Sequence, residues 1–420
     1  MTVVSVREFA ILTTDSVEPT LDRGTLAAED FAWLVGLAIK GEAVARPVRF
    51  ESPRVLKVLN LVGVIRLPSG VDLEILPKHT EVADSLPATR RLLFRMIAAA
   101  HDIPARETEL ADLEVLERPF TEWMAKAFVG QVTQLLRTGL RSDYLRIEGR
   151  EPYLRGRLDI ARQLRAGPAG LLEFHVSHDV FSLDRPENRL IRTAIDKVAR
   201  YSRAPETWRV ARELSMLLSE VPSSLDVRTD LSRWRDDRAM AHYRPLRPLC
   251  ELILTGRTPF AVSGRDEALS MLFPMERLFE AFVERSVRRA LPDHRVQSQP
   301  RTHSLCSYAE RPWFDLRPDL VARRGEETLV IDAKWKRLNS DPGMRFGISQ
   351  ADVYQLHAYG QTYLSGKGEL HLVYPLTANF PVTEGPLLMK PALSLHISSI
   401  DLETGAIRWP EMMGATPAGD

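Results

Sequence analysis

The stretch from Trp313 to Arg337 constrains the fold of this chain more than any other, because its pattern predicts two strands joined by a tight turn. Phe314 to Ala322 is one β-rich run, and Thr328 to Ile331 is a second, apolar run. The charged segment between them contains Gly325-Glu326, a favourable turn centre. The stretch therefore predicts an antiparallel hairpin whose register is set by the position of its turn.

Two acidic residues lie opposite each other in the predicted register. Counting outward from the turn pairs Asp319 with Asp332, and facing side chains in such a pair have Cβ atoms about 4.5–5.5 Å apart. Two carboxylates at that distance repel each other unless a cation lies between them, and Mg²⁺ is held by one or two carboxylates plus water and phosphate oxygens. Strand alternation places Lys334 on the same face as Asp332. The hairpin therefore predicts a metal site with a lysine beside it.

The hairpin also admits a purely structural explanation. Asp332 follows the apolar run 329–331, and a charge emerging from a buried strand needs a partner. A salt bridge from Lys334 to either aspartate would satisfy that need in a protein without catalytic activity. Pro318 interrupts the ladder and predicts a bulge, and Asp315 has the same parity as Asp319 but lies off the Asp332 pairing.

Two predicted helices flank the hairpin in the sequence. Ser349 to Asp352 is a capping box that opens a helix over 353–364, on which Gln355 and Tyr359 are four residues apart and share one face. This pair either contacts the site or is ordinary amphipathicity. Before the hairpin, residues 274–291 predict an amphipathic helix carrying Glu280, which either faces the metal or belongs to a solvated stripe.

The ordered motifs resemble a known nuclease family. Pro318-Asp319 followed by Asp332-Ala333-Lys334 is similar to the PD-(D/E)xK pattern, and residues 355–359 are similar to the Q-x-x-x-Y element of the RecB-related subgroup. The combination resembles McrC, the nuclease subunit family of the McrBC modification-dependent restriction system. Three further blocks carry the same resemblance: residues 73–78, 154–159 and 186–191.

The resemblance implies a Mg²⁺-dependent endonuclease, with Mn²⁺ as an alternative ion. It assigns Asp319 and Asp332 to the metal, with the Ala333 carbonyl as a further ligand, and Lys334 to orienting or deprotonating the attacking water. It also implies supporting or DNA-contacting roles for four other residues: Gln355, Tyr359, Glu280 and Lys336. Strand alternation also places Lys336 on the strand face of Lys334.

The same resemblance implies two partners, double-stranded DNA and an AAA+ GTPase similar to McrB that reads modified cytosine. In that family the N-terminal region docks on the GTPase, which assigns docking to residues 1–82. This chain contains no G-x-x-x-x-G-K-[ST] motif, so we expect it to bind no nucleotide itself. Two other functions stay open: a free-standing DNA repair nuclease, and a non-catalytic assembly subunit that stimulates the motor.

Length and composition predict an α+β multidomain protein. The 420 residues are 44% hydrophobic and carry 56 basic and 56 acidic side chains, which favours a local basic channel over a globally basic surface. Two cysteines are too few for a disulfide framework or a zinc site, and no apolar run reaches the length of a membrane span. We therefore expect a cytoplasmic protein.

Four regions follow from the pattern along the chain. Residues 1–82 are expected to form a β-rich domain, a small partly open barrel with one helix near 27–40. Residues 83–264 are expected to be mainly helical, apart from a strand over 153–160 whose arginines either touch phosphate or face solvent. The resemblance implies that residues 265–410 form a PD-(D/E)xK endonuclease domain, with a central mixed sheet flanked by helices, and residues 411–420 are expected to be a loose tail.

Overall fold

The computed structural model describes residues 3–40, 46–78, 85–103, 119–166, 172–255, 271–378, 380, 386–389 and 392–409. The described residues form two compact units, one from residues 3–120 together with 271–409, and one from 121–255. The second unit is thus inserted into the sequence of the first. This division reflects packing alone, so it does not test the functional boundaries predicted at residues 82, 264 and 410.

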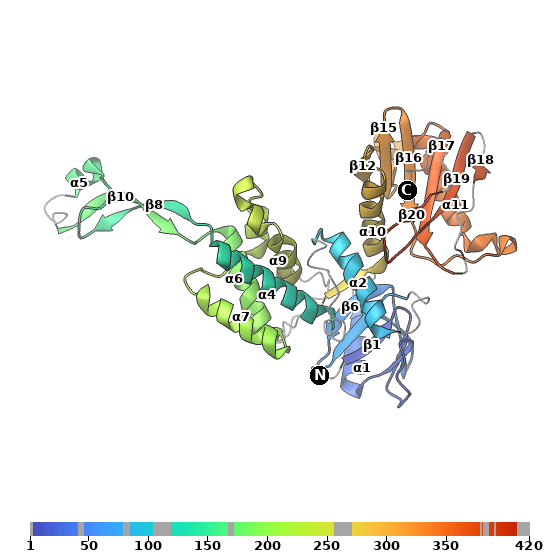
Figure 1. Cartoon of the computed structure of the whole chain (residues 1–420), viewed down its shortest axis with the longest axis horizontal. Helices are drawn as coiled ribbons and strands as arrows, with labels where there is room; N and C mark the ends of the chain where they lie inside the picture. The colour runs from blue at the N-terminus through green and yellow to red at the C-terminus, as the bar shows by residue number, and fades with distance from the viewer. Residues whose placement is uncertain are drawn as a thin grey trace, which may run out of the picture. The chain divides into compact units, whose positions relative to one another are not determined.

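The N-terminal part of the first unit contains two four-stranded sheets (Figure 1). The strands of one, in spatial order, are β1 (Val3–Arg7), β7 (Asp72–Leu76), β6 (Leu61–Arg66) and β11 (Met271–Pro274). Those of the other are β3 (Arg23–Thr25), β2 (Ile11–Thr13), β5 (Val55–Val58) and β4 (Val48–Ser52). The strands and helix α1 (Ala28–Lys40) lie close to their predicted positions and share one apolar core. The prediction of a single partly open barrel is wrong, since the described strands pair in two sheets.

Strand β11 explains part of this difference, because it joins the N-terminal sheet from the far end of the sequence. It pairs antiparallel with β6, placing Leu272 beside Gly63. Gly63 has φ +129°, and a Cβ there would lie 2.0 Å from the Met271 carbonyl oxygen. Only glycine permits so close an approach of the two backbones. Because β11 lies more than 200 residues further along the sequence than β6, no local pattern in residues 1–82 predicts this pairing.

Helix α2 (Leu86–Ala100) links the N-terminal sheets to the C-terminal part of the same unit. Its buried Arg90 forms an ion pair of 2.7 Å with buried Glu74 of β7. Arg95 donates a hydrogen bond of 2.8 Å to the carbonyl of Leu402, near the end of the described chain. Because each end of α2 is tied to a different part, the two parts pack as one unit.

The C-terminal part is built on a mixed sheet, as predicted. Its strands in spatial order are β12 (Arg295–Ser298), β15 (Leu320–Arg324), β16 (Glu327–Ala333), β17 (Lys367–Pro375), β19 (Ala392–Ile400) and β18 (Leu387–Met389), with β20 (Ile407–Arg408) paired to β19. Helix α11 (Gln350–Tyr363) packs with Leu356 against apolar side chains of β16, β17 and β19. Helix α10 (Met275–Ala290) contacts β12 and β16.

The run from Phe314 to Ala322 is not one strand, which corrects the prediction. Strand β14 (Arg311–Leu316) pairs with β13 (His303–Tyr308) in a separate two-stranded sheet, and β15 begins only after Pro318. Proline lacks the amide needed to continue a ladder, so the chain leaves one sheet before it enters the next. The turn at Gly325-Glu326 is where it was predicted.

The second unit contains the predicted helices and a sheet that was not predicted. Its main helices are α4 (Phe120–Thr138), α6 (Pro186–Tyr201), α7 (Pro205–Leu217), α8 (Val227–Ser232) and α9 (Leu246–Thr255), with the 3-10 helix η4 (Arg238–Tyr243). A long antiparallel pair, β8 (Asp143–Glu151) and β10 (Phe174–Ser182), projects from them with β9 (Arg157–Leu158) and α5 (Ile160–Arg165) (Figure 1). We call these four elements the arm.

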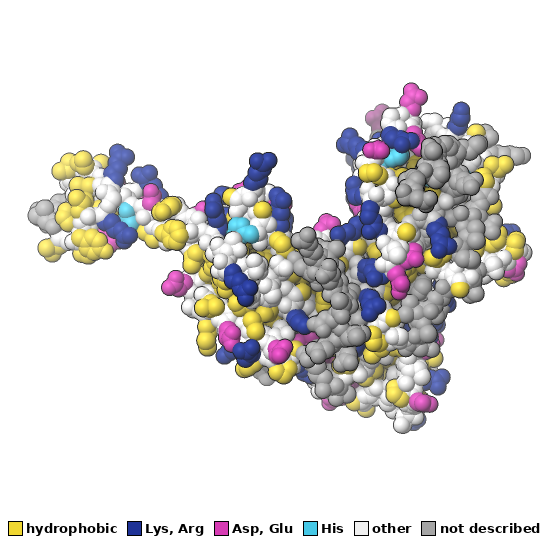
Figure 2. Space-filling view, viewed as in Figure 1, with side chains coloured by type: hydrophobic (Ala, Val, Ile, Leu, Met, Phe, Trp, Pro, Cys, Tyr) yellow, Lys and Arg dark blue, Asp and Glu magenta, His cyan; other side chains and the backbone are white. Residues whose placement is uncertain are grey.

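The predicted strand over 153–160 is therefore wrong except at Arg157–Leu158, because Asp159 caps α5 instead. Hydrophobic side chains gather on the surface of the arm (Figure 2). The exposed ones include Tyr144, Ile160, Leu164 and Phe181. The predicted tail 411–420 lies outside the described residues. No helix in the described ranges is long and apolar enough to cross a membrane.

Candidate metal centre

The register of β15 and β16 brings the two predicted acids together. Leu320 pairs with Ile331 in the ladder, so Asp319 and Asp332 are the residues next outward from the last paired position, in agreement with the count from the turn. Asp319 lies just before β15, and its Oδ2 accepts a hydrogen bond of 2.8 Å from the Ala333 amide. Asp332 is 1% exposed and follows the buried apolar run of β16. Both acids therefore lie at the same end of the strand pair.

Lys334 lies beside Asp332, immediately after β16. Its Nζ is 2.6 Å from Asp332 Oδ2 and donates a hydrogen bond of 3.2 Å to Gln355 Oε1. The salt bridge considered from the sequence is thus present. It compensates Asp332 directly, while the hydrogen bond from Ala333 to Asp319 comes from an uncharged amide. The structural explanation therefore accounts for Asp332 better than for Asp319.

The pKa values at the centre reflect two neighbouring acids that are both largely buried from solvent. Burial, reinforced by the charges of Asp332 and Glu280, raises the pKa of Asp319 to about 8. Burial also raises the pKa of Asp332, against the opposing effect of Lys334. Burial disfavours the Lys334 ammonium, yet the aspartates outweigh it and raise the pKa of Lys334. Without a cation the centre therefore favours a protonated acid beside an ammonium group.

Helix α11 supplies a hydrogen-bonded chain that ends at the centre. Gln355 accepts from Lys334 and donates 2.7 Å to the Tyr359 hydroxyl, which donates 2.9 Å to the carbonyl of Arg317. Gln355 and Tyr359 thus connect Lys334 to the segment that carries Asp319. The predicted capping box of Ser349 and Asp352 is present, which gives Asp352 a structural role.

Helix α10 contributes Glu280 from another direction. Its Oε2 accepts a hydrogen bond of 2.9 Å from Gln299, whose backbone amide donates 2.8 Å to the carbonyl of Asp319. Burial raises the pKa of Glu280, and Asp332 adds to the rise. Glu280 is therefore a neighbour of the centre and not a member of a fully solvated stripe. Sequence reasoning missed Gln299, whose only signal is its place directly after β12.

Asp315 and Lys336 lie outside strands β15 and β16. Asp315 pairs with Ser304 in the β13–β14 sheet, as its exclusion from the Asp332 pairing predicts. Lys336 was placed on the strand face of Lys334, and this is wrong because β16 ends at Ala333. The Lys336 amide donates 2.8 Å to the Lys334 carbonyl in a tight turn, and its side chain is exposed.

The donor set suits a hard divalent cation. Asp319 and Asp332 offer carboxylate oxygens at one point, and the charge of Asp332 adds to burial in raising the pKa of Asp319. A cation between them would reverse that effect, and Mg²⁺ needs only one or two carboxylates. In the part of the chain that the structure describes, no three His, Cys, Asp or Glu side chains form a metal-binding group. The centre is thus a two-carboxylate arrangement.

The three outer sequence blocks have structural explanations. Residues 73–78 include β7, whose Glu74 forms the buried pair with Arg90. In the block 154–159, Gly156 has φ +67°, and a Cβ there would lie 2.5 Å from the Ser177 carbonyl oxygen. Both blocks therefore contribute contacts that stabilise the fold.

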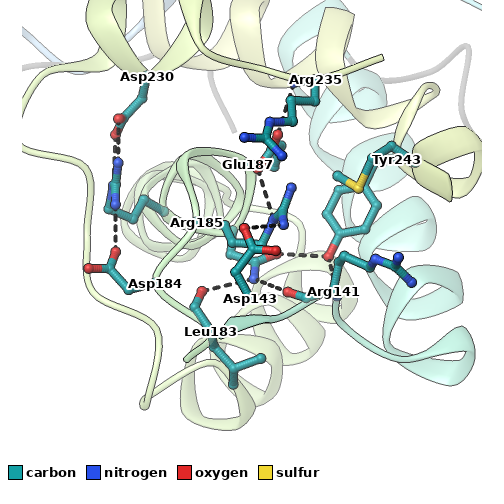
Figure 3. A network of polar contacts seen from close by, with 12 residues as sticks. Arg141, Asp143, Leu183, Asp184, Arg185, Glu187, Asp230, Arg235 and Tyr243 are labelled. Atoms are coloured by element: carbon teal, nitrogen blue, oxygen red, sulfur yellow. Dashed lines mark hydrogen bonds and ion pairs between the residues drawn. The ribbon is translucent and has the colours of Figure 1, made fainter. Parts of the chain in front are cut away.

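The block 186–191 lies in a polar network where the arm meets the helices (Figure 3). Buried Arg185 contacts Asp143 at 2.5 Å and Glu187 at 3.3 Å. The amide of Asn188 donates to the carbonyls of Arg141 and Leu183, each at 2.9 Å. Both strands of the arm are thereby fixed at their base.

Comparisons with known proteins agree with this architecture. A chain from a refined half-complex of a tetradecameric assembly of Thermococcus gammatolerans McrB AAA+ hexamers with bound McrC has a TM-score of 0.70 at 18% identity, covering 97% of both chains. A chain of the Thermococcus gammatolerans McrBC complex has a TM-score of 0.54 at 20% identity, covering 70% of this chain and 89% of that one. No curated protein matches the sequence.

The fold, with its inserted helical unit and its mixed sheet, thus defines a protein of the class found in McrBC assemblies. The family model described as McrBC 5-methylcytosine restriction system component matches residues 56–375. The chain belongs to this family, and its predicted resemblance to McrC is confirmed.

Proposed function

We propose that this chain is the metal-dependent DNA endonuclease subunit of a modification-dependent restriction system, and that residues 265–410 carry a PD-(D/E)xK nuclease fold. The observation that supports this proposal best is Asp319. It is a partly buried acid beside a second acid, and its pKa is raised to about 8. A structural hairpin gains nothing from such a pair, whereas two adjacent carboxylates suit a Mg²⁺ or Mn²⁺ site.

Each residue of the centre then has a role in phosphodiester hydrolysis. Asp319 and Asp332 would hold the ion, with the Ala333 carbonyl as a further ligand. The bound ion would lower the pKa of its water and neutralise charge on the phosphate. Lys334, whose raised pKa keeps it protonated, orients the water and offsets the negative charge of the transition state. Gln355 and Tyr359 hold Lys334 in place, and Glu280 and Lys336 are proposed to contact DNA or support the site.

The proposals for the substrate and the partner are based on the family to which the chain belongs. The substrate is double-stranded DNA carrying 5-methylcytosine, and the activating partner is an AAA+ GTPase similar to McrB, docked through residues 1–82. The family description and the assembly of the Thermococcus gammatolerans protein with McrB hexamers support both. The arm exposes apolar side chains, so it is a second surface at which docking must be tested.

The decisive experiment measures cleavage of methylated and unmethylated DNA with Mg²⁺, the GTPase partner and GTP. Asp319→Asn and Lys334→Met should each lower the cleavage rate by at least about a hundredfold, the size of effect found when a transition-state stabilising group is removed. Asp315→Asn is the matched control, because Asp315 is an exposed aspartate of the neighbouring β14.

Three outcomes separate the alternatives. Cleavage that needs neither GTP nor the partner would favour a free-standing repair nuclease. Stimulation of the partner GTPase without cleavage by the unmodified chain would favour a non-catalytic assembly subunit. Unchanged cleavage by Asp319→Asn would show that the metal centre is placed wrongly.

A further inference from the structure

A buried glutamate from the N-terminal sheet reaches the residue next to Lys334. Glu8 directly follows β1 and is 0% exposed. Its Oε2 accepts hydrogen bonds of 3.0 Å from the Trp335 indole and 2.9 Å from the Lys78 amide. Glu8 and Trp335 are 327 residues apart in sequence, yet both belong to the first compact unit.

A carboxylate at this position is costly for the fold. Its Oε1 is buried without a hydrogen-bond partner among the described residues, and an apolar side chain would avoid the cost of desolvation. The charged groups around it are Lys78 and, on α10, Glu276, whose effects on Glu8 oppose each other. Because burying the Glu8 carboxylate is costly, its hydrogen bond from the Trp335 indole points to a specific role for this contact.

Trp335 occupies the point at which the backbone turns away from the metal centre. The Lys334 amide donates 2.9 Å to the Val373 carbonyl, and the Lys336 amide donates 2.8 Å to the Lys334 carbonyl. Trp335 is thus the central residue of a three-residue turn. Its ring packs on Phe279 of α10, with ring centroids 5.3 Å apart. Holding this ring fixes the direction in which the chain leaves Lys334.

We propose that Glu8 is a positioning residue for Lys334 and that it acts through Trp335. The carboxylate fixes the indole, the indole fixes the turn, and the turn keeps Lys334 Nζ between Asp332 and Gln355. This inference rests on the proposed nuclease role of Lys334. Through Glu8, the N-terminal sheet then supports a centre whose residues lie more than 300 positions further along the sequence.

The test uses the full chain with its partner, GTP, Mg²⁺ and methylated DNA. Trp335→Phe keeps an aromatic ring beside Phe279 and removes the indole donor. We expect kcat for cleavage to fall about tenfold, the lower end of the loss found when a group that orients a metal-site residue is removed, with KM for DNA little changed. Glu8→Ala should reproduce this loss, and Glu8→Gln, which keeps an acceptor, should retain most of the rate.

A second readout does not depend on cleavage. The sequence has nine lysines, so the side-chain ¹³C resonance of Lys334 can be assigned in labelled protein by its loss in Lys334→Arg. In Trp335→Phe the pKa followed by this resonance should move towards that of a free lysine. Trp313→Phe, which changes a half-exposed tryptophan of β14, is the matched control and should leave resonance and rate unchanged.

The outcomes distinguish this inference from the nuclease proposal. If Trp335→Phe matches Trp313→Phe in both kcat and the Lys334 resonance, the positioning role of Glu8 is overturned. If the unmodified chain fails to cut DNA while the Lys334 resonance still responds to Trp335→Phe, the positioning holds and the nuclease proposal fails.

Discussion

At the scale of single residues, the pairing of Asp319 with Asp332 was predictable because it depends on local counting. A glycine turn fixes the register, and the register fixes which side chains face each other. The contact between Glu8 and Trp335 was not predictable, because no local pattern reports a hydrogen bond across 327 residues. Lys336 was misplaced because alternation was extended past the end of β16.

The raised pKa of Asp319 predicts how pH changes the stability of the metal-free protein. Its folded pKa of about 8 lies above the ordinary value of about 3.9, so the folded state binds more protons than the unfolded state between these limits. The free energy of unfolding should therefore fall as pH rises from about 5 to 8. Asp319→Asn should weaken this dependence in urea unfolding measured across the range, most of all between pH 7 and 8, because burial also raises the pKa of Glu8 to about 7.

Two comparisons complete that measurement. Asp315→Asn should keep the pH dependence of the unmodified chain, because Asp315 is exposed in β14. Added Mg²⁺ should restore stability at pH 8 in the unmodified chain but not in Asp319→Asn. A slope that survives in Asp319→Asn would mean that another group titrates.

At the scale of elements, strong periodicity predicted helices well and failed for strands that depend on distant partners. Helices α10 and α11 lie within three residues of their predicted ranges, 274–291 and 353–364. Strands β8 and β10 were missed because they have little buried apolar face, with Val176 the buried apolar residue among their described side chains. Alternation signals a strand only where one side of the sheet is covered. An exposed arm gives no such signal.

The buried ion pair at the base of the arm leads to a prediction about the stability of the second unit. Arg185→Met removes a guanidinium that contacts Glu187, leaving a 1%-exposed carboxylate without its cation. We expect the free energy of unfolding of the second unit to fall by about 3–5 kcal/mol, the cost of breaking a buried pair. The double variant Arg185→Met with Glu187→Leu should recover most of this loss, since an apolar pair avoids the unpaired charge.

The control for this prediction is Arg209→Met, which removes an exposed pair with Glu213 on α7 and should change stability little. Thermal unfolding of the three variants measures the difference. Equal effects of Arg185→Met and Arg209→Met would show that the network of Figure 3 does not stabilise the unit.

At the scale of the whole molecule, the inserted second unit predicts that the first can fold without it. The rings of Phe120 and Phe273 have centroids 6.2 Å apart, so the two ends of the insertion lie close together. We expect a chain in which a short linker replaces residues 121–269 to keep a cooperative unfolding transition and the Lys334 resonance. If docking lies in residues 1–82, it should also stimulate the GTPase partner.

Loss of stimulation in that folded chain would move docking to the second unit, with the apolar arm as its described surface. A form of the full chain with Tyr144 and Phe181 changed to serine separates the arm from the helices. Stimulation that survives both changes would support the N-terminal assignment.

The contribution of β11 to the N-terminal sheet bears on how the protein is made. Strand β6 lacks its outer neighbour until residue 274 has left the ribosome, so for most of synthesis its apolar edge is open to pairing with other nascent chains. A fragment that stops at residue 82 carries the same open edge permanently. Such a fragment should aggregate unless a peptide corresponding to β11 is supplied in trans.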